Sequence, residues 1–286
     1  MIAVLDAGGT KTEMYLGDST RREIRKVEGI NPYFQSDEEI RNRLHHLLLP
    51  TDNLDEDLKH VWYYGTGCSD LAQSQRVQIQ LTSVFPNAKV TVEHDLMGAC
   101  RALCFDEPGI VGILGTGSNA CVFDGRKIEK QMVSLGFWLG DEGGGGNLGK
   151  MLLADWLKGR FPSDLEHSFS EWVGISKKEA LVRIYSDKNA NTTVSRLAAF
   201  AVQNLDHFYM VEKIRDNFKA YFNEIGSITA SYKDRPFHFT GSIAFQLQEV
   251  LKEVAWNLSY ETGKIVSSPT EELFRYHTKS NEYANF

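Results

Sequence analysis

Short apolar runs alternate with longer amphipathic segments along this chain of 286 residues. The apolar runs have the length of strands, and they predict strands over residues 1–5, 14–16, 61–64, 89–92, 110–114, 120–123 and 237–240. Apolar positions three and four residues apart predict helices over residues 38–49, 71–84, 96–105, 147–158, 177–185, 194–203, 208–225 and 243–258. The segment after Ser267 indicates a turn and a final short helix. This mixture of strands and helices predicts an α/β protein.

One local pattern occurs twice. A strand, the residues DAGGT and a second strand lie near residue 6, and a strand, the residues GTGSN and a second strand lie near residue 116. The repetition predicts two related domains, each of which opens with a hairpin turned by glycines. The chain is expected to pass between them near Glu93 to Gly98 and to cross back near Ser267.

Composition narrows the classes of function. The chain is 42% hydrophobic and carries a net charge of −7, so it can build a core but lacks the basic surface that nucleic-acid binding requires. No Cys-x-x-Cys pair occurs among the four cysteines, which favours buried thiols over a zinc or redox site. No leader opens the chain and no apolar run is long enough to span a membrane. We therefore expect a reduced, cytoplasmic protein with no membrane partner.

The first hairpin carries candidate phosphate ligands. Gly8 and Gly9 let the backbone approach a ligand closely, and successive N–H groups in such a turn form an anion site. Thr10 adds a hydroxyl group and Lys11 a positive charge. Asp6 ends the preceding strand, where its carboxylate suits a hydrated Mg²⁺. A purely structural turn is the alternative, although it would need fewer glycines.

The second hairpin strengthens the phosphate interpretation. Gly115 and Gly117 flank Thr116, and Ser118 supplies another hydroxyl group. The spacing is neither that of a Walker loop nor that of a dinucleotide-binding turn, since an apolar strand follows. Two such hairpins, one in each half, could hold a polyphosphate from opposite sides of a cleft.

Three further segments carry polar residues at turns. GFWLGDEGGGGNLGK, residues 136–150, is expected to form a loop that delivers a helix N-terminus, a favourable anion site. Asp141 and Glu142 in it are either solvated acids or contacts to a substrate or metal. Gly241 and Ser242 join a strand to a helix, where they either face a flat ring or form an ordinary turn with Ser242 as the helix cap. Asp95 is either a general base or a helix cap.

Taken in order, these segments resemble the sugar kinase, Hsp70 and actin superfamily. More narrowly, the chain resembles the family that joins N-acetylglucosamine kinases to the BadF/BadG/BcrA/BcrD ATPases, and the resemblance covers nearly the whole chain. DAGGTKTE and GTGSN are similar to the two phosphate motifs, TGSIA to the adenosine motif, HDLMGA to the segment of the catalytic aspartate, and GINPY to a segment with a sugar-binding asparagine. GDEGGGGNLGK resembles the kinase GDEGS loop, but its glycine-rich continuation departs from the family pattern and implies a more flexible loop.

The resemblance implies two ribonuclease H-like domains with a nucleotide cleft between them, over residues 1–96 plus 268–286 and residues 97–267. It implies ATP and Mg²⁺ as cofactors and phosphoryl transfer to an amino sugar, with N-acetylglucosamine as the default. Asp95 would be the base and Asp6 the metal-binding residue. The implied nucleotide contacts are Gly8, Gly9, Thr10, Lys11, Gly115, Thr116, Gly117, Gly241 and Ser242, and the implied sugar contacts are Asn31, Thr116, Asn119, Trp138, Gly140 and Asp141.

Several alternatives stay open at this stage. Glucosamine and N-acetylmuramic acid are near alternatives for the sugar, since a pocket separates them by one or two contacts. An ATPase that activates a dehydratase or reductase through a shared iron-sulfur cluster is a second function, with Cys100 and Cys121 as its proposable ligands. A nucleotide-dependent sensor without turnover is a third. The oligomeric state is open, with a homodimer as the commonest case.

Overall fold

The computed structural model describes residues 1–18, 22–48, 58–187 and 189–283. These residues form two compact units, each built on a five-stranded mixed sheet. Unit 1 comprises residues 1–107, 125–127 and 268–286, and unit 2 comprises residues 108–124 and 128–267. The sequence-based boundary after residue 96 falls inside a helix, α4 (Asp95–Leu103), and the structure keeps this helix whole within unit 1.

The sheet of unit 1 has the strand order β3-β2-β1-β4-β5. Its strands are β1 (Ile2–Ala7), β2 (Lys11–Gly17), β3 (Arg22–Glu28), β4 (His60–Gly65) and β5 (Lys89–His94). The first three strands are antiparallel neighbours, whereas β1, β4 and β5 are parallel. The carboxyl ends of β1, β4 and β5 therefore lie at one edge of the sheet, where ligands bind in open α/β sheets.

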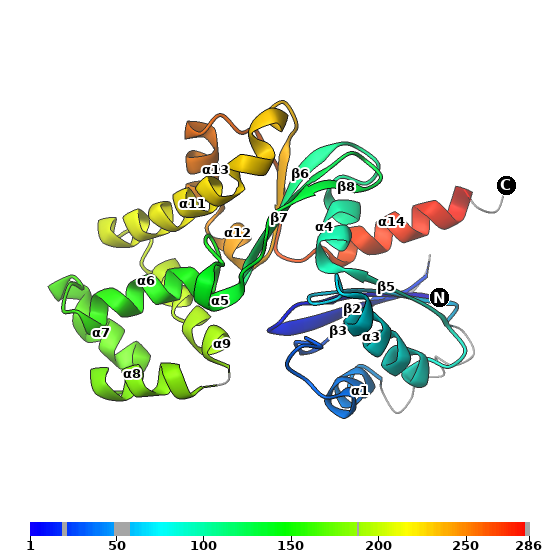
Figure 1. Ribbon diagram of the computed structural model, residues 1–286, viewed down its shortest axis with the longest axis horizontal. Coiled ribbons are helices and arrows are strands. Elements are labelled where there is room, and N and C mark those ends of the chain that lie inside the picture. The colour runs from blue at the N-terminus through cyan, green and yellow to red at the C-terminus, as the bar shows by residue number, and fades with distance from the viewer. Residues whose placement is uncertain (19–21, 49–57, 188, 284–286) are drawn as a thin grey trace. The chain divides into compact units, whose positions relative to one another are not determined.

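Two layers of helices cover the sheet of unit 1 (Figure 1). One face packs against α1 (Asp37–His45) and α3 (Leu71–Val84), and the core there includes Leu5, Ile40 and Leu81. The other face packs against α4 and α14 (Thr270–Tyr283), the last helix of the chain. His277 of α14 stacks on Trp62 with ring centroids 4.0 Å apart and hydrogen-bonds the Tyr64 hydroxyl at 2.8 Å.

The sheet of unit 2 repeats the topology of the first. Its order is β10-β9-β6-β7-β8, in which β6, β7 and β8 are antiparallel neighbours and β6, β9 and β10 are parallel. The strands are β6 (Gly109–Leu114), β7 (Ser118–Phe123), β8 (Ile128–Gln131), β9 (Phe237–Thr240) and β10 (Thr262–Val266). The repeated hairpin pattern in the sequence thus reflects a repeated fold, and the predicted α/β class is confirmed.

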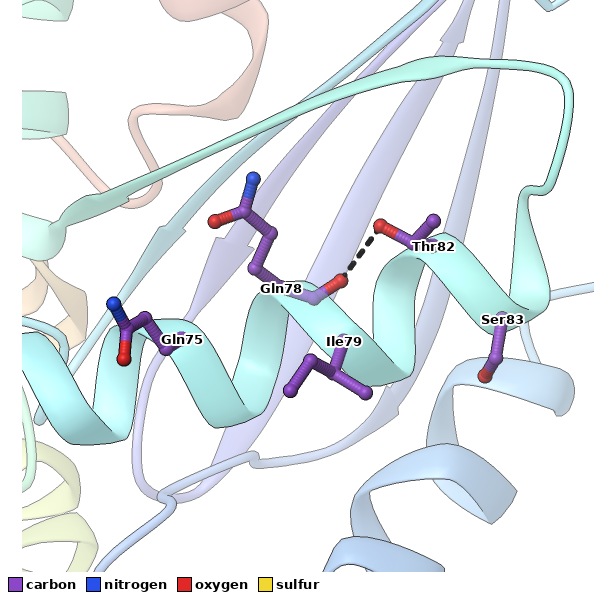
Figure 2. Close-up of a pocket in the computed structure, with 5 residues that line it drawn as sticks. All are labelled: Gln75, Gln78, Ile79, Thr82 and Ser83. Carbon is purple, nitrogen blue, oxygen red and sulfur yellow. Dashed lines mark hydrogen bonds between the residues drawn. The ribbon is translucent and has the colours of Figure 1, made fainter.

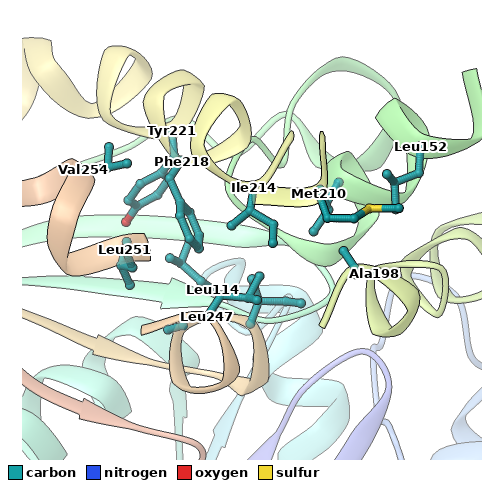
Figure 3. Packing of buried hydrophobic residues seen from close by; sticks show 14 of the residues in the cluster. Leu114, Leu152, Ala198, Met210, Ile214, Phe218, Tyr221, Leu247, Leu251 and Val254 are labelled. Carbon is teal, nitrogen blue, oxygen red and sulfur yellow. The ribbon is translucent and has the colours of Figure 1, made fainter. Parts of the chain in front are cut away.

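Most helices of unit 2 lie between β8 and β9. They are α5 (Gly136–Leu139), α6 (Gly145–Leu157), α7 (Ser163–Val173), α8 (Lys177–Ser186), α9 (Ala190–Ser195), α10 (Ala198–Gln203) and α11 (Phe208–Thr229), followed by the short 3-10 helix η1 (Ala230–Tyr232). After β9 come α12 (Ser242–Gln246) and α13 (Gln248–Asn257). Figure 3 shows the core of this unit, in which Phe218 and Tyr221 of α11 meet Leu114 of β6 and Leu247.

The predicted elements agree with most of this architecture. Two helices expected to be continuous, over 194–203 and 243–258, are each divided into two. The helix expected over 38–49 ends at His45, and its last expected residue, Leu49, lies outside the described residues. In the described part of the chain, no helix combines the length and the apolar character needed to cross a bilayer.

Candidate functional site

The hairpin between β1 and β2 is held in place by backbone hydrogen bonds. The Gly8 N–H donates to the Lys11 carbonyl at 2.9 Å, and the Gly29 N–H donates to the Thr10 carbonyl at 3.0 Å. Gly29 is packed so tightly that a Cβ there would lie 2.4 Å from the carbonyl of Gly9. Gly9 itself is exposed, with no atom within 4 Å of the position of an added Cβ. The turn is therefore held in place on the side of Gly29 and is open to solvent at Gly9.

Two carboxyl groups of unit 1, those of Asp6 and Asp95, lie at the carboxyl edge of its sheet. Burial and the nearby charge of Asp95 raise the pKa of Asp6 to about 7, an effect that Lys11 partly offsets. Burial also raises the pKa of Asp95, although His94 and hydrogen bonds from the Leu96 N–H and the Thr66 side chain favour its charged form. The structure thus brings the predicted base and the predicted metal-binding residue together.

Asp95 is not a helix cap. It is the first residue of α4, His94 is the cap residue, and the Asp95 carboxylate accepts from the Leu96 N–H at 2.8 Å. The carboxylate is therefore oriented by the first turn of the helix and does not act as its N-cap.

A loop that sequence reasoning missed lies beside these carboxyl groups. Gly65 is the last residue of β4 and Thr66 and Gly67 follow it, and the Thr66 N–H donates to the Ala7 carbonyl at 2.9 Å. The Tyr63 ring folds back against Gly65, and its buried hydroxyl has no hydrogen-bond partner among the residues that the structure describes. The signal was present in the sequence, because Gly-Thr-Gly occurs here as it does at residues 115–117.

Asn31 lies against the same loop. A Cβ on Gly67 would be 3.2 Å from Asn31 Oδ1 and 3.1 Å from the Tyr33 ring. Gly67 has a φ of +78°, so a left-handed conformation as well as the close contact favours glycine here. Because Thr66 hydrogen-bonds Asp95, one short loop joins the predicted sugar-binding asparagine to the predicted base.

The hairpin of unit 2 is supported by the glycine-rich segment. The N–H groups of Gly145 and Gly146 donate to the carbonyls of Gly115 and Thr116 at 2.8 and 2.7 Å. A Cβ on Gly144 would lie 2.8 Å from the backbone of Gly117. The first residues of α6 thus pack directly on the hairpin.

Two expectations about the glycine-rich segment are wrong. It is not a flexible loop, because Asn217, fully buried on α11, accepts from the Gly143 N–H at 3.0 Å and donates to the Gly144 carbonyl at 3.3 Å. Nor are the first two N–H groups of α6, those of Gly145 and Gly146, available to an anion, since they donate to the hairpin carbonyls. Asn217 was missed from the sequence, although it is a polar residue on the apolar stripe of Ile214, Phe218 and Tyr221.

Asp141 is placed at the second hairpin. Its carboxylate accepts from the Ser118 N–H at 3.2 Å and lies where a Cβ on Gly117 would come within 2.8 Å of it. Burial raises its pKa, while the Ser118 N–H and Lys150 favour the charged form. Its φ of 64° is unusual for a residue other than glycine, which is typical of functional positions. The structure therefore favours a specific role for this acid over that of a solvated loop residue.

The remaining predicted residues of unit 2 differ in how they are placed. The Asn119 side chain accepts from the Ala120 N–H at 2.9 Å on β7, and Gly140 ends α5. Trp138 is exposed and its ring stacks on that of Tyr185. Ser242 is the first residue of α12 and not its cap.

Gly241 is required by the fold itself. It has a φ of +118°, and a Cβ would lie 2.3 Å from the Leu114 carbonyl oxygen. This close approach places the turn after β9 next to the turn after β6.

The two sets of predicted residues lie in different units. Unit 1 holds Asp6, Gly8, Gly9, Thr10, Lys11, Asn31 and Asp95, and unit 2 holds Gly115, Thr116, Gly117, Asn119, Trp138, Gly140, Asp141, Gly241 and Ser242. Figure 2 shows a shallow pocket along α3, lined by Gln75, Gln78, Ile79, Thr82 and Ser83. None of the predicted residues lines it, so it is not the candidate site.

Comparison with known proteins identifies the class. No protein-family model and no curated protein sequence matches the chain. A solved structure from Porphyromonas gingivalis, of a protein assigned as an N-acetylglucosamine kinase, is 33% identical with a TM-score of 0.92, and the match covers 98% of this chain and 100% of that one.

Two other solved structures share the fold at lower identity. A protein from Chromobacterium violaceum, also assigned as an N-acetylglucosamine kinase, is 15% identical with a TM-score of 0.71, over 96% of this chain and 98% of that one. A ROK family glucokinase from Streptomyces griseus, in complex with glucose and AMPPNP, is 12% identical with a TM-score of 0.56, over 97% and 98% of the two chains.

Two sheets of the same topology, each with a glycine-turned hairpin, define a member of the sugar kinase, Hsp70 and actin superfamily. Within it, the chain belongs to the N-acetylglucosamine kinase family, whose class of activity is ATP-dependent phosphoryl transfer.

Proposed function

We propose that this protein transfers the γ-phosphoryl group of ATP to a hydroxyl group of an amino sugar, with N-acetylglucosamine as the first candidate. The observation that carries the proposal is the loop of residues 65–68, which Asn31 contacts on one side and which hydrogen-bonds Asp95 on the other. An amide that can hold a hydroxyl-bearing substrate and a carboxylate that can accept its proton therefore lie on either side of the same short segment. The relative from P. gingivalis supports the same kinase class.

Asp95 is proposed as the general base. Burial raises the pKa of Asp95 towards physiological pH, which makes its carboxylate a better acceptor for the proton of a hydroxyl group. The hydrogen bonds from Leu96 and Thr66 keep the charged form available and orient it. Phosphoryl transfer depends mainly on position and charge neutralisation, so one oriented carboxylate is sufficient help for the attacking oxygen.

The two hairpins are proposed to bind phosphate groups of ATP, through Gly8 to Lys11 in unit 1 and Gly115 to Gly117 in unit 2. Each hairpin offers backbone N–H groups and a threonine hydroxyl, and each is fixed by hydrogen bonds behind the turn. The S. griseus glucokinase has the ATP analogue AMPPNP bound, which supports a nucleotide as the ligand. That the hairpins face each other across a cleft stays a prediction.

Asp6 fits a hydrated magnesium ion. Its carboxyl group lies among acidic neighbours, so a cation would favour its charged form. Among the described residues, no group of three or more His, Cys, Asp or Glu side chains could hold a metal directly, which suits an ion that keeps most of its water. When bound, the ion would neutralise charge on the phosphate groups.

In unit 2, Thr116, Asn119, Trp138, Gly140 and Asp141 are proposed to contact the sugar. Asp141 has the strongest support, because it is oriented by the Ser118 N–H and its backbone is held in an unfavourable conformation. Gly241 and Ser242 are proposed to border the adenosine. A cytoplasmic location and a homodimer stay expectations.

The experiment that tests the proposal is a screen for sugar-dependent release of ADP over hexoses and amino sugars, with the sugar phosphate identified by mass spectrometry. We expect turnover with N-acetylglucosamine, and glucosamine and N-acetylmuramic acid are the informative comparisons. Asp95→Asn should lower kcat by about 100-fold or more, the range of general-base losses, with ATP affinity nearly unchanged. ADP release that no sugar stimulates would refute the proposal.

The structure disfavours the iron-sulfur alternative. All four cysteines are buried, and Cys100 and Cys121 are fully inaccessible. A cluster shared between two copies of a chain needs thiols at a surface, so the burial of these thiols argues against this function. The expectation of small buried thiols is confirmed.

A further inference from the structure

The segment that carries Asn31 is a compact turn with internal hydrogen bonds. Asn31 Oδ1 accepts from the Tyr33 N–H at 3.0 Å, and the Asn31 carbonyl accepts from the Phe34 N–H at 3.1 Å. The Asn31 N–H donates to the Gln35 side chain at 3.1 Å, and that side chain donates to the Gly29 carbonyl at 3.0 Å. We call residues 29–35 the asparagine turn.

This network fixes which end of the Asn31 amide is used internally. Its oxygen is used by the Tyr33 N–H, so the NH₂ end is the group left to donate to a ligand. Turns of this kind are held by local hydrogen bonds alone unless another element supports them. The rings of Tyr33 and Phe34 are exposed, so they do not anchor the turn in the core.

Arg76 of α3 supplies that support from outside the turn. Its guanidinium donates to the Pro32 carbonyl at 2.7 Å and to the Gln35 carbonyl at 3.0 Å. The same group donates to the Gln73 side chain at 2.7 Å and pairs with Asp37 at the start of α1. One planar cation therefore binds the middle and the last residue of the turn and ties it to two helices, a geometry that the fork of an arginine allows and a lysine does not.

We propose that Arg76 is a positioning residue for the sugar: it holds the asparagine turn in the conformation that presents the Asn31 NH₂ group to the substrate. This inference rests on the proposed function. Arg76 touches no predicted substrate contact, so its effect is expected on sugar affinity and not on the chemical step. A turn that is ordered before binding avoids an entropy loss during binding, which is how such a residue raises affinity.

The test is a kinetic comparison of wild type, Arg76→Met and Arg76→Lys. Methionine keeps much of the apolar stem and removes all the donors. We expect Arg76→Met to raise the KM for the amino sugar about tenfold or more, because hydrogen bonds from a charged group are among the strong ones. At saturating sugar, kcat and the KM for ATP should change less than about twofold. The sugar KM of Arg76→Lys should lie between those of wild type and Arg76→Met, since lysine keeps the positive charge but lacks the forked donors of the guanidinium.

A matched control is Arg41→Met on α1. Arg41 is exposed, and the same substitution there should leave both KM values unchanged. A second readout needs no activity: hydrogen exchange of the Tyr33 and Phe34 amides should accelerate in Arg76→Met, because these N–H groups donate within the turn. Thermal unfolding of each variant shows whether the whole fold is affected.

The outcomes separate the two proposals. Suppose that wild type phosphorylates an amino sugar. If Arg76→Met then leaves the KM for the sugar unchanged, or lowers kcat without a selective rise of that KM, the role of Arg76 is refuted and the proposed function stands. Faster exchange of Tyr33 and Phe34 with an unchanged sugar KM likewise refutes it, because the turn is then loosened without consequence. If wild type acts on no amino sugar, the proposed function fails and the role of Arg76 fails with it.

Discussion

Gly9 gives a direct test of whether the first hairpin binds phosphate. An added Cβ would meet no atom within 4 Å, and Gly9 is not among the glycines with positive φ. The protein alone therefore gives no reason for glycine at this position. If glycine is nevertheless required, the requirement comes from a ligand that approaches the backbone.

The expected effects of Gly9→Ala follow from this geometry. The free energy of unfolding should stay within about 0.5 kcal/mol of wild type or rise by up to about 1 kcal/mol, because alanine restricts the unfolded chain. A methyl group at a phosphate-binding turn should break at least one N–H contact to a charged oxygen, which contributes about 1.5 to 3 kcal/mol. ATP should then bind about 10- to 150-fold more weakly.

The assay combines calorimetric titration of ATP with urea unfolding for three variants. Gly9→Ala should lose affinity without losing stability. Gly29→Ala should lose both, because its Cβ would lie 2.4 Å from the Gly9 carbonyl while ordinary contact begins near 3.4 Å, so the backbone must shift. Gly226→Ala, in open space on α11, should keep wild-type affinity. A folded Gly9→Ala protein that binds ATP like wild type would refute the phosphate role of this hairpin.

Three further predictions follow from the described contacts. Asn31→Asp keeps the oxygen that accepts from Tyr33 but replaces the NH₂ donor, so sugar KM should rise at least about tenfold with the thermal midpoint nearly unchanged, and an unaltered KM would remove Asn31 from the site. Asn217→Leu leaves the Gly143 N–H without its acceptor and should destabilise the protein by about 1 to 3 kcal/mol in urea unfolding; a neutral effect would show that the glycine-rich segment does not depend on it. Burial, with Arg101 and His60, lowers the pKa of His277 to about 3, so the unfolded chain binds more protons below about pH 6.5 and stability should fall from there towards pH 3, more steeply in wild type than in His277→Phe; equal pH dependence would contradict this.

The strands that the sequence failed to predict have a common cause. β3, β8 and β10 are all edge strands of their sheets. Edge strands tend to carry charged residues, which discourage pairing with other chains, and the sequence REIRKVE of β3 shows this plainly. The apolar pattern that identified β1 and β6 reflects burial in the middle of a sheet. The edge strand β5 was also found, because Val90 and Val92 pack against the core, so the strands that escape are edges without such an apolar pattern.

The helices show a related limit. The segment 243–258 has continuous apolar periodicity, yet Leu247, fully buried, separates α12 from α13. The spacing of apolar residues shows which side chains face the core. It does not change when one helix ends and the next begins in a new direction, provided that both helices bury the same kind of face. The C-terminal segment was expected to be a short helix, but α14 runs from Thr270 to Tyr283, and its Phe274 and His277 contact Tyr15 and Trp62 of the sheet of unit 1.

Candidate residues were found where they belong to a recognisable sequence motif. They were missed where their role depends on contacts with residues far away in the sequence. Asp6 and Asp95 each follow or end a strand, so their positions at one sheet edge could be anticipated. Arg76 lies in a helix whose sequence gives no sign of the turn that it holds, more than forty residues earlier in the chain. Asn217 could have been suspected as a polar residue on a buried helix face, but its partners Gly143 and Gly144 could not.

The glycines in and around the two hairpins fall into two groups: those that the packing of the protein requires and those that it does not. In the segment 143–146, an added Cβ would meet other protein atoms at every position, and at Gly144 these are backbone atoms of Gly117 and Thr116 that cannot move aside easily. At Gly9 and Gly115 it would meet nothing within 4 Å. A run of glycines in the sequence suggested flexibility and a ligand, yet the protein itself fills the space around that run. Gly9 and Gly115 have empty space in front and no positive φ, a combination that Gly226 on α11 shares. Because Gly9 and Gly115, unlike Gly226, lie at the tips of the two hairpins, these tips are the better candidates for phosphate contact.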